Sequence, residues 1–457
     1  MKHKLLSWGI FSAALCFCTV QAIIPLPKGN NYYVSVSGYD NNTGTLKAPF
    51  RSVQKGCDVL KPGDTLYIRA GEYHEKIEIN STGTEGEYIT VQPYGNERVI
   101  LNGEGNSKRS NIIHIKDKSY IRIKGLELRN SRDGDTPSGI MIEGFGRGIE
   151  ILSNKIYSIE SDSNSHGIAV YGRNSYIPIQ GIKIEGNEIY NCRLGSSESL
   201  VVNGNVEDFR ICGNIIHDNN NIGIDCIGFE KTAVLNDQPR SGLIAGNTVY
   251  NISSANNPVY EGDACAGGIY VDGGKDIIIE RNRVYDCDIG IEVASEHYNK
   301  AAANILVRSN LIYSSHLYGL SLGGASGGNG YAENCHFICN TLYDNQIGIN
   351  MQKSRYNKII SNIVYDTGTL LEGPLGSNIL SCNVFYSPDG NPYKLPGFKD
   401  PKFKDPVHKD FELSKDSPAI DAGDPLYLCY GGEMDILNKP RVSNGRIDCG
   451  AFEYEEE

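Results

Sequence analysis

Acidic residues recur at matching positions of a repeated phrase, where their side chains could do acid–base chemistry. Asp225 and Glu292 come second after a Gly in this phrase, and Asp272 comes fourth. Two neighbouring carboxyl groups can divide the roles of acid and of nucleophile or base in cleaving a glycosidic bond. The phrase is a Gly followed by an aliphatic residue and then alternating residues: Gly139-Ile-Met-Ile, Gly167-Ile-Ala-Val, Gly223-Ile-Asp-Cys, Gly268-Ile-Tyr-Val, Gly290-Ile-Glu-Val, Gly319-Leu-Ser-Leu and Gly348-Ile-Asn-Met.

Strand geometry predicts where these acids lie. Side chains alternate between the two faces of a strand, so the Ile and Val positions fill a core while the acids face outward. Adjacent strands lie about 4.8 Å apart, which places the Cα atoms of Asp272 and Glu292 roughly 8 Å apart. Their carboxyl groups could then be about 5 to 9 Å apart, a range that spans retaining and inverting glycosidases. A solvated acidic face or a Ca²⁺ site is the alternative.

Further side chains are expected to contact the substrate. Tyr270 is placed between two of the acids, where it could stack on a sugar ring or hydrogen-bond the nucleophile. Asp225 and Glu230 could bind sugar hydroxyls or tune the charge of Asp272. His297 could hydrogen-bond a carboxylate or a sugar.

The elements that must position these residues are coils of a stacked solenoid. A phrase of Asn, any residue, an aliphatic and usually Tyr returns every few tens of residues, which is typical of repeat architectures. The Asn side chains are expected to turn inward and stack as a hydrogen-bonded ladder. The phrase begins at Asn154, Asn187, Asn214, Asn247, Asn282, Asn310, Asn340, Asn362 and Asn383.

The apolar stretches are short and β-branched, so we predict an all-β chain with one elongated domain. Residues 23–105 form an N-terminal cap and first coils, with a short helix over residues 52–60 that closes the core. Residues 106–390 form the coil stack, and residues 391–457 form a C-terminal closing segment. Irregular segments 230–242 and 253–267 interrupt the repeat near the acids and are expected to wall the site.

The first 22 residues have the pattern of a signal peptide, with Lys2 and Lys4 before an apolar run and a small-residue cleavage site. A membrane anchor is the alternative, but the run is short for a spanning helix. We therefore expect a secreted, periplasmic or cell-surface protein, active as a monomer, with no membrane-spanning segment after cleavage. The net charge of −12 argues against a nucleic-acid partner.

Cysteines lie beside many of the repeat phrases, and two interpretations are open. We favour small apolar residues in an interior stack over a disulfide framework. The residues concerned are Cys192, Cys212, Cys226, Cys287, Cys339 and Cys382.

Three N-terminal segments and two C-terminal phrases resemble parts of known secreted proteins. The phrases Asp416-Ser-Pro-Ala-Ile-Asp-Ala-Gly423 and Ile447-Asp-Cys-Gly-Ala-Phe-Glu-Tyr454 are similar to a C-terminal closure common on bacterial β-helix proteins. The segments Tyr33-Val-Ser-Val-Ser-Gly-Tyr-Asp, Ala48-Pro-Phe-Arg-Ser-Val-Gln-Lys and Pro62-Gly-Asp-Thr-Leu-Tyr-Ile-Arg-Ala-Gly are similar to the opening of right-handed parallel β-helix proteins. That group contains many polysaccharide lyases and glycoside hydrolases. The resemblance implies a single-domain right-handed parallel β-helix whose partner is a polysaccharide or oligosaccharide.

The segment from Gly268 to His297 resembles the catalytic region of the parallel β-helix β-xylosidases and related retaining hydrolases. The resemblance implies that Asp272 is the nucleophile and Glu292 the acid/base. This chain departs from the pattern in having Gly273-Gly274 after the Asp, and it has an additional acid, Glu296, beside the His. Which of the two glutamates donates the proton is therefore open.

Two other functions are open. A polysaccharide lyase would use Ca²⁺ and a basic residue, with Lys275 or Arg240 as the base and the acids as the Ca²⁺ ligands. A glycan-binding protein would use the same face without chemistry. For the hydrolase we expect no metal and no cofactor, and no phosphate-binding loop for ATP, NAD or flavin is present. Lys275 is also a candidate substrate contact. It lies at a strand end, just after the two glycines.

Overall fold

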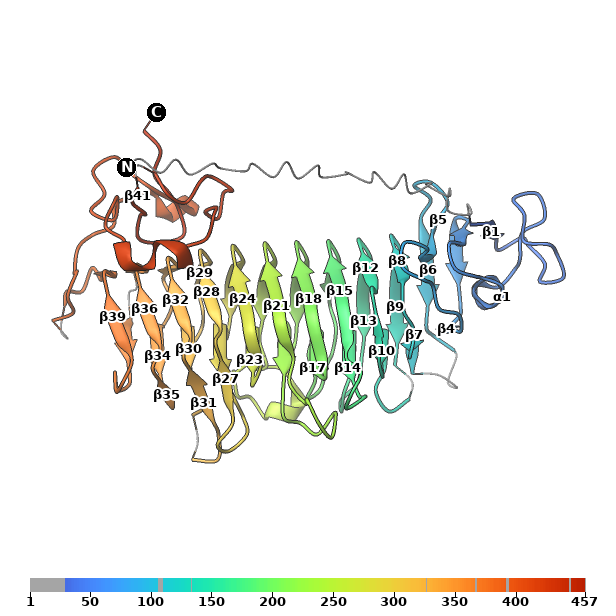
Figure 1. The fold of residues 1–457 in the computed structure, drawn as a ribbon, viewed down its shortest axis with the longest axis horizontal. Coiled ribbons are helices and arrows are strands. Elements are labelled where there is room, and N and C mark those ends of the chain that lie inside the picture. Colours follow the sequence, from blue (N-terminus) through green and yellow to red (C-terminus); the bar gives the residue numbers. More distant parts are fainter. Residues whose placement is uncertain are drawn as a thin grey trace, which may run out of the picture.

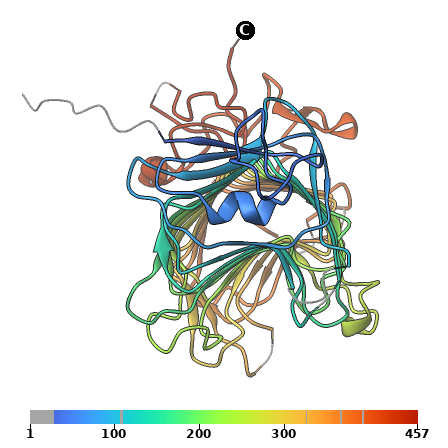
Figure 2. The ribbon, with the colours of Figure 1, turned by 90° about the vertical axis from the view of Figure 1, so that its right-hand side faces the viewer.

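The chain winds into a right-handed parallel β-helix, seen from the side in Figure 1 and end-on in Figure 2. The computed structural model describes residues 29–456 except 106–109, 133, 326, 366–367, 392–393 and 444. Each central coil contributes one strand to each of three parallel sheets, as the coil β21 (Arg240–Ala245), β22 (Thr248–Ile252) and β23 (Gly267–Asp272) shows. The predicted fold class is confirmed.

The sheet that carries the predicted acids has eleven strands. All its pairs are parallel, and the Gly-Ile phrases form most of its strands. In order along the stack they are β4 (Ile77–Ile79), β7 (Asn111–Lys116), β10 (Ser138–Glu143), β14 (His166–Gly172), β17 (Leu200–Gly204), β20 (Ile224–Ile227), β23, β26 (Ile289–Ala294), β30 (Tyr318–Leu322), β34 (Ile347–Met351) and β38 (Thr369–Glu372). We call this the acidic sheet.

The inward faces form one continuous core. Ile269, Val271, Ile291 and Val293 are fully buried within it, as the alternation predicts. The predicted Asn ladder is also present. Its Asn residues lie in the turns between two of the sheets, as Asn247 lies between β21 and β22. Each Asn side chain donates to the next, as Asn247 Nδ2 does to Asn282 Oδ1 at 2.9 Å.

Outside the core, the Tyr of the Asn phrase stacks ring on ring along the sheet of β22 and β25 (Arg283–Cys287). The rings of Tyr250 and Tyr285 are 5.0 Å apart and parallel, and Tyr285 and Tyr313 are 4.8 Å apart. Because the rings cover one another's faces, this ladder stabilises the stack and leaves few ring faces free for a ligand.

The N-terminal end is covered by a short helix, α1 (Val53–Asp58), as expected. Ser52 caps it by accepting a hydrogen bond from the Lys55 backbone. Figure 2 shows the helix across the mouth of the coil. Its buried Val53 and Cys57 close the apolar layer of the first coils, which would otherwise be open to water.

The C-terminal segment after the last coil folds back along the side of the stack (Figure 1). It contains the antiparallel pair β41 (Phe403–Asp405) and β42 (Asp410–Leu413) and the short helices η2 (Pro406–His408) and η3 (Pro425–Tyr430). Phe411 is buried against Tyr313 and Tyr343 of the stack.

All cysteines in the described part of the chain are free thiols. Of those expected inside the stack, Cys192, Cys226, Cys287 and Cys339 are buried, but Cys212 is only partly covered and Cys382 is exposed. The prediction for Cys382 was wrong: its side chain is exposed, whereas Cys339, which also precedes a ladder Asn in a left-handed backbone conformation, is buried because it packs with Ile447 of the C-terminal segment.

The proposed signal peptide lies outside the described residues. Within them, no helix has both the length and the apolar character needed to cross a membrane.

Candidate active site

One outward column of the acidic sheet brings the predicted residues side by side. Asp225 on β20 is paired with Tyr270 on β23, and Tyr270 with Glu292 on β26. Ser321 on β30 follows Glu292 in the same column. Although these side chains face away from the core, Asp225 and Tyr270 are 2% and 6% exposed. Asp225 and Tyr270 are therefore shielded from water, whereas Glu292 in the same column is partly exposed.

Asp272 ends β23 and lies one strand from Glu292, offset by two residues, since Asp272 pairs with Ala294. It is 3% exposed, and the backbone N–H of Glu296 donates to its Oδ1 at 2.7 Å. Burial raises its pKa to about 8, and the charges of Glu296, Glu230 and Glu292 add to this.

The backbone conformation explains why a glycine directly follows Asp272. Gly273 has φ 73°, a left-handed conformation that favours glycine. A Cβ there would also lie 2.8 Å from the Phe229 ring. The chain can thus turn away directly after Asp272 while Phe229 packs over the turn.

Glu292 and Glu296 differ in their surroundings. Glu292 accepts a hydrogen bond from the Ser321 hydroxyl at 3.3 Å, and burial together with the charge of Glu296 raises its pKa to about 7. Glu296 lies in the loop after β26 at the exposed rim. Surrounding protein atoms and the charge of Glu230 raise its pKa, while His297 opposes this.

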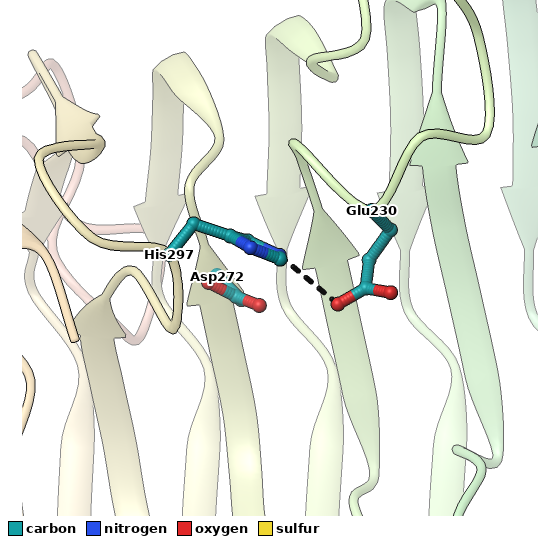
Figure 3. A group of neighbouring side chains, drawn as sticks. All are labelled: Glu230, Asp272 and His297. Atoms are coloured by element: carbon teal, nitrogen blue, oxygen red, sulfur yellow. Dashed lines mark hydrogen bonds and ion pairs between the residues drawn. The ribbon is translucent and has the colours of Figure 1, made fainter. Parts of the chain in front are cut away.

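Figure 3 shows Glu230 and His297 approaching Asp272 from the loops after β20 and β26. His297 Nε2 lies 3.0 Å from Glu230 Oε1. One ligand atom from each of the three residues lies within 4.8 Å of the others, so the group could hold a divalent metal ion. A His ligand suits zinc-like metals better than Ca²⁺, which prefers oxygen.

The structure adds a residue to this site that the sequence analysis did not identify. Glu198 precedes β17 and is 7% exposed. Its Oε2 lies 3.5 Å from His166 Nδ1, and His166 Nε2 is 3.2 Å from the Tyr171 hydroxyl. Burial raises the pKa of Glu198 to about 8 and lowers that of His166 to about 4.

Glu198 was missed because its coil lacks the Gly-Ile phrase. The β17 strand follows Ser199, and Leu200 pairs with Ile168 and Ile224. Ser199 thus takes the place of the Gly, so this coil does not contain the Gly-Ile phrase. The short continuous apolar run Leu200-Val201-Val202 was the sequence signal that could have revealed this strand.

Lys275 and Arg240 do not join the acids. Both lie on another sheet, where Lys275 begins β24 (Lys275–Glu280) and pairs with Arg240 of β21. Lys275 Nζ is 3.7 Å from Asp276, and Arg240 is ion-paired with Glu207. The structure therefore does not bring the expected basic residue to the acidic sheet.

Two families of sequences match this chain. Residues 32–193 match the Pel9A-like, right handed beta helix region, and residues 267–387 match the Right handed beta helix region. The uncharacterized protein YwoF of Bacillus subtilis (strain 168) is 36% identical over 402 residues, or 86% of this chain and 82% of YwoF. Pectate lyase PEL9 of Emericella nidulans is 28% identical over 219 residues, or 41% of this chain and 50% of that protein.

Solved structures share the fold at low identity. The GH136 lacto-N-biosidase from Eubacterium ramulus has a TM-score of 0.60 and 15% identity, covering 79% of this chain and 68% of its own. Pectate lyase Pel9A has a TM-score of 0.52 and 16% identity, covering 94% and 97%. XylC with xylose has a TM-score of 0.50 and 13% identity, covering 92% and 98%. These likenesses concern the fold, so the relation to β-xylosidases stays a prediction.

Proposed function

The chain belongs to the same protein family as YwoF of Bacillus subtilis, and from this premise we propose that it is an enzyme acting on a glycan. Support comes from the pectate lyase that resembles part of the chain and from the lacto-N-biosidase that shares its fold. The acidic sheet supplies a partly shielded face with ionisable groups, which a fold alone would not require. The N-terminal segment supports a proposed location outside the cytoplasm.

Within this class we propose glycoside hydrolysis. The observation that carries it is the pair Asp272 and Glu292 on adjacent strands: Asp272 is buried, Glu292 is partly exposed, and their pKa values are raised to about 8 and about 7. Raised values mean that the pair holds a transferable proton near neutral pH. Because the pKa of Asp272 is the higher of the two, the free enzyme holds the proton on Asp272, and this proton must pass to Glu292 before Asp272 can attack.

In the proposed reaction, Glu292 protonates the glycosidic oxygen of the leaving group and Asp272 attacks the anomeric carbon. Asp272 is held for this by the Glu296 backbone N–H. Glu292, once ionised, then accepts a proton from water, and that water hydrolyses the glycosyl-enzyme bond and restores Asp272. Glu296 stays the alternative proton donor.

The test uses Asp272→Asn and Glu292→Gln, which keep shape while removing the acid. We expect each to lose about a hundredfold or more of the activity on the best substrate from a screen of neutral, amino and acidic oligosaccharides. Azide should rescue Asp272→Ala by replacing the nucleophile, giving a glycosyl azide that NMR detects. Asp276→Asn, on the exposed side of β24, is the matched control. Full activity in Asp272→Asn would refute the assignment.

A metal-dependent lyase is the second candidate, favoured by the Glu230, Asp272 and His297 group and by the partial similarity to a pectate lyase. Its weakness is that Lys275 and Arg240 lie on another sheet. Elimination from polygalacturonate creates an unsaturated product that absorbs near 235 nm. Growth of that signal, abolished by a chelator and absent in Asp272→Asn, would favour the lyase over the hydrolase.

A further inference from the structure

The acids of the candidate site differ from Glu143 on the same sheet in having no Lys or Arg partner among the described residues. On β10, Glu143 lies 3.1 Å from Lys116 and 2.8 Å from Arg173. By contrast, no Lys or Arg in the described part of the chain forms an ion pair with the site acids. These are Glu198, Asp225, Asp272, Glu292 and Glu296.

Two of these acids also have a buried oxygen that accepts no hydrogen bond. These atoms are Oδ1 of Asp225 and Oε2 of Glu198, on residues that are 2% and 7% exposed. Buried polar atoms in proteins are nearly always partnered, so these two oxygens are free to accept hydrogen bonds from a ligand in this site. His166 beside Glu198 is buried and adds no compensating charge.

The two residues are placed next to the proposed reacting groups. Asp225 is on β20, the strand directly beside the one that ends with Asp272. Glu198 precedes β17, which is the next strand along the stack and pairs with β20. Both acids therefore lie on the N-terminal side of the proposed catalytic pair, within the reach of one or two sugar rings.

We propose that the glycan carries a free amino sugar at this position, and that Glu198 and Asp225 receive its ammonium group. The inference rests on the proposed function and names its substrate class. Burial raises the pKa of Glu198 to about 8, so its carboxyl group is neutral in the free protein at pH 6 and ionises as the ammonium binds. The positive charge of the ammonium offsets the cost of that ionisation, and its three N–H donors supply hydrogen bonds to both carboxyl groups.

Other sugars are expected to bind the carboxyl groups of Glu198 and Asp225 less favourably. A uronic acid would place a further carboxylate among uncompensated acids, which disfavours binding unless a metal ion is present. A neutral hydroxyl or an acetamido group can donate a hydrogen bond but brings no positive charge to favour the ionised carboxylates.

The experiment measures binding by calorimetry, at pH 6 with turnover blocked by Asp272→Asn. The probes are tetrasaccharides of glucosamine and galactosamine, their N-acetylated forms, a galacturonate tetramer, and CaCl₂ alone. We expect a free-amine tetramer to bind at least about tenfold more tightly than its N-acetylated form. Adding Glu198→Gln or Asp225→Asn should remove most of that preference, and circular dichroism together with urea unfolding should show that the variants fold.

Glu372→Gln is the matched control, because Glu372 is an exposed acid on β38 of the same sheet, paired with Asn350. It should leave the preference unchanged. Equal or tighter binding of the N-acetylated form would overturn the proposal, as would Ca²⁺ binding that Asp225→Asn abolishes. If the free-amine form binds more tightly but Asp272→Asn keeps full activity, only the proposed hydrolysis is refuted. If Asp272→Asn is inactive but the free-amine form binds no more tightly, only the inference about the amino sugar is refuted.

Discussion

Asp272 illustrates how a buried carboxyl group can lower the stability of its own fold. Its pKa in the folded chain is about 8, against an ordinary value of 3.8. Between these pH values the folded protein retains a proton that the unfolded chain has released. The free energy of unfolding therefore falls as pH rises through this window, and the loss is complete above pH 8.

We predict that Asp272→Asn stabilises the protein in a pH-dependent way. Because Asn stays neutral, the free energy of unfolding should rise by about 1–2 kcal/mol at pH 8 and change little near pH 4. Urea unfolding at the two pH values measures this. The exposed Asp276→Asn should change neither value. A destabilised Asp272→Asn at pH 8 would mean that its carboxylate is stabilised in the folded state by a partner.

At the scale of the element, the turn between sheets depends on the Asn ladder. Asn247 Oδ1 accepts hydrogen bonds from the backbone N–H and the Nδ2 of Asn214, at 2.9 and 3.0 Å. Its Nδ2 donates to the Ile211 carbonyl and to Asn282, both at 2.9 Å. Since the side chain is 1% exposed, water cannot replace these bonds when the side chain is removed.

We predict that Asn247→Ala lowers the free energy of unfolding by about 3 kcal/mol or more, because it leaves buried donors and a carbonyl unpaired. Asn383→Ala is the matched comparison at the last rung. Its side chain donates to the Ile359 carbonyl and accepts from the backbone N–H and Nδ2 of Asn362, but within the described residues it lacks the donation to a following Asn that Asn247 makes, and it is 6% exposed. Its loss should be clearly smaller. Equal losses from the two variants in urea unfolding would show that position in the ladder does not matter.

At the scale of the whole molecule, the candidate site lies in the middle of the stack, away from both ends. The α1 helix covers one end, and the C-terminal segment lies against the last coils (Figure 1). Several coils on each side hold the acidic strands in register. In a solenoid each coil contacts mainly its neighbours, so damage near the end should stay local.

We predict that Phe411→Ala loosens the C-terminal segment and spares the site. Phe411 is 1% exposed and its ring centroid is 4.9 Å from that of Tyr343. Its loss should weaken docking of the segment by about 3 kcal/mol. Limited proteolysis should then cut the segment faster, while glycan binding and activity stay unchanged. The control Val407→Ala changes an exposed side chain on η2, and the protease should cleave its C-terminal segment at the wild-type rate.

Much of the fold follows from the sequence because each coil repeats the same short-range pattern. The alternation after each Gly is sufficient to predict which of Asp225, Tyr270 and Glu292 face outward, and their order on adjacent strands. The Asn ladder and the helix over residues 52–60 were predictable for the same reason, since local periodicity and capping decide them.

Only the tertiary structure decided what surrounds those side chains. Ser199 in place of Gly concealed the coil of Glu198, and burial by distant loops is not encoded in any single repeat. The direction of Lys275 likewise depended on the turn at Gly273, which carries the chain to another sheet. Periodicity determines the register of a solenoid, whereas desolvation and charge compensation depend on all atoms near a group, and those come together only when the chain has folded.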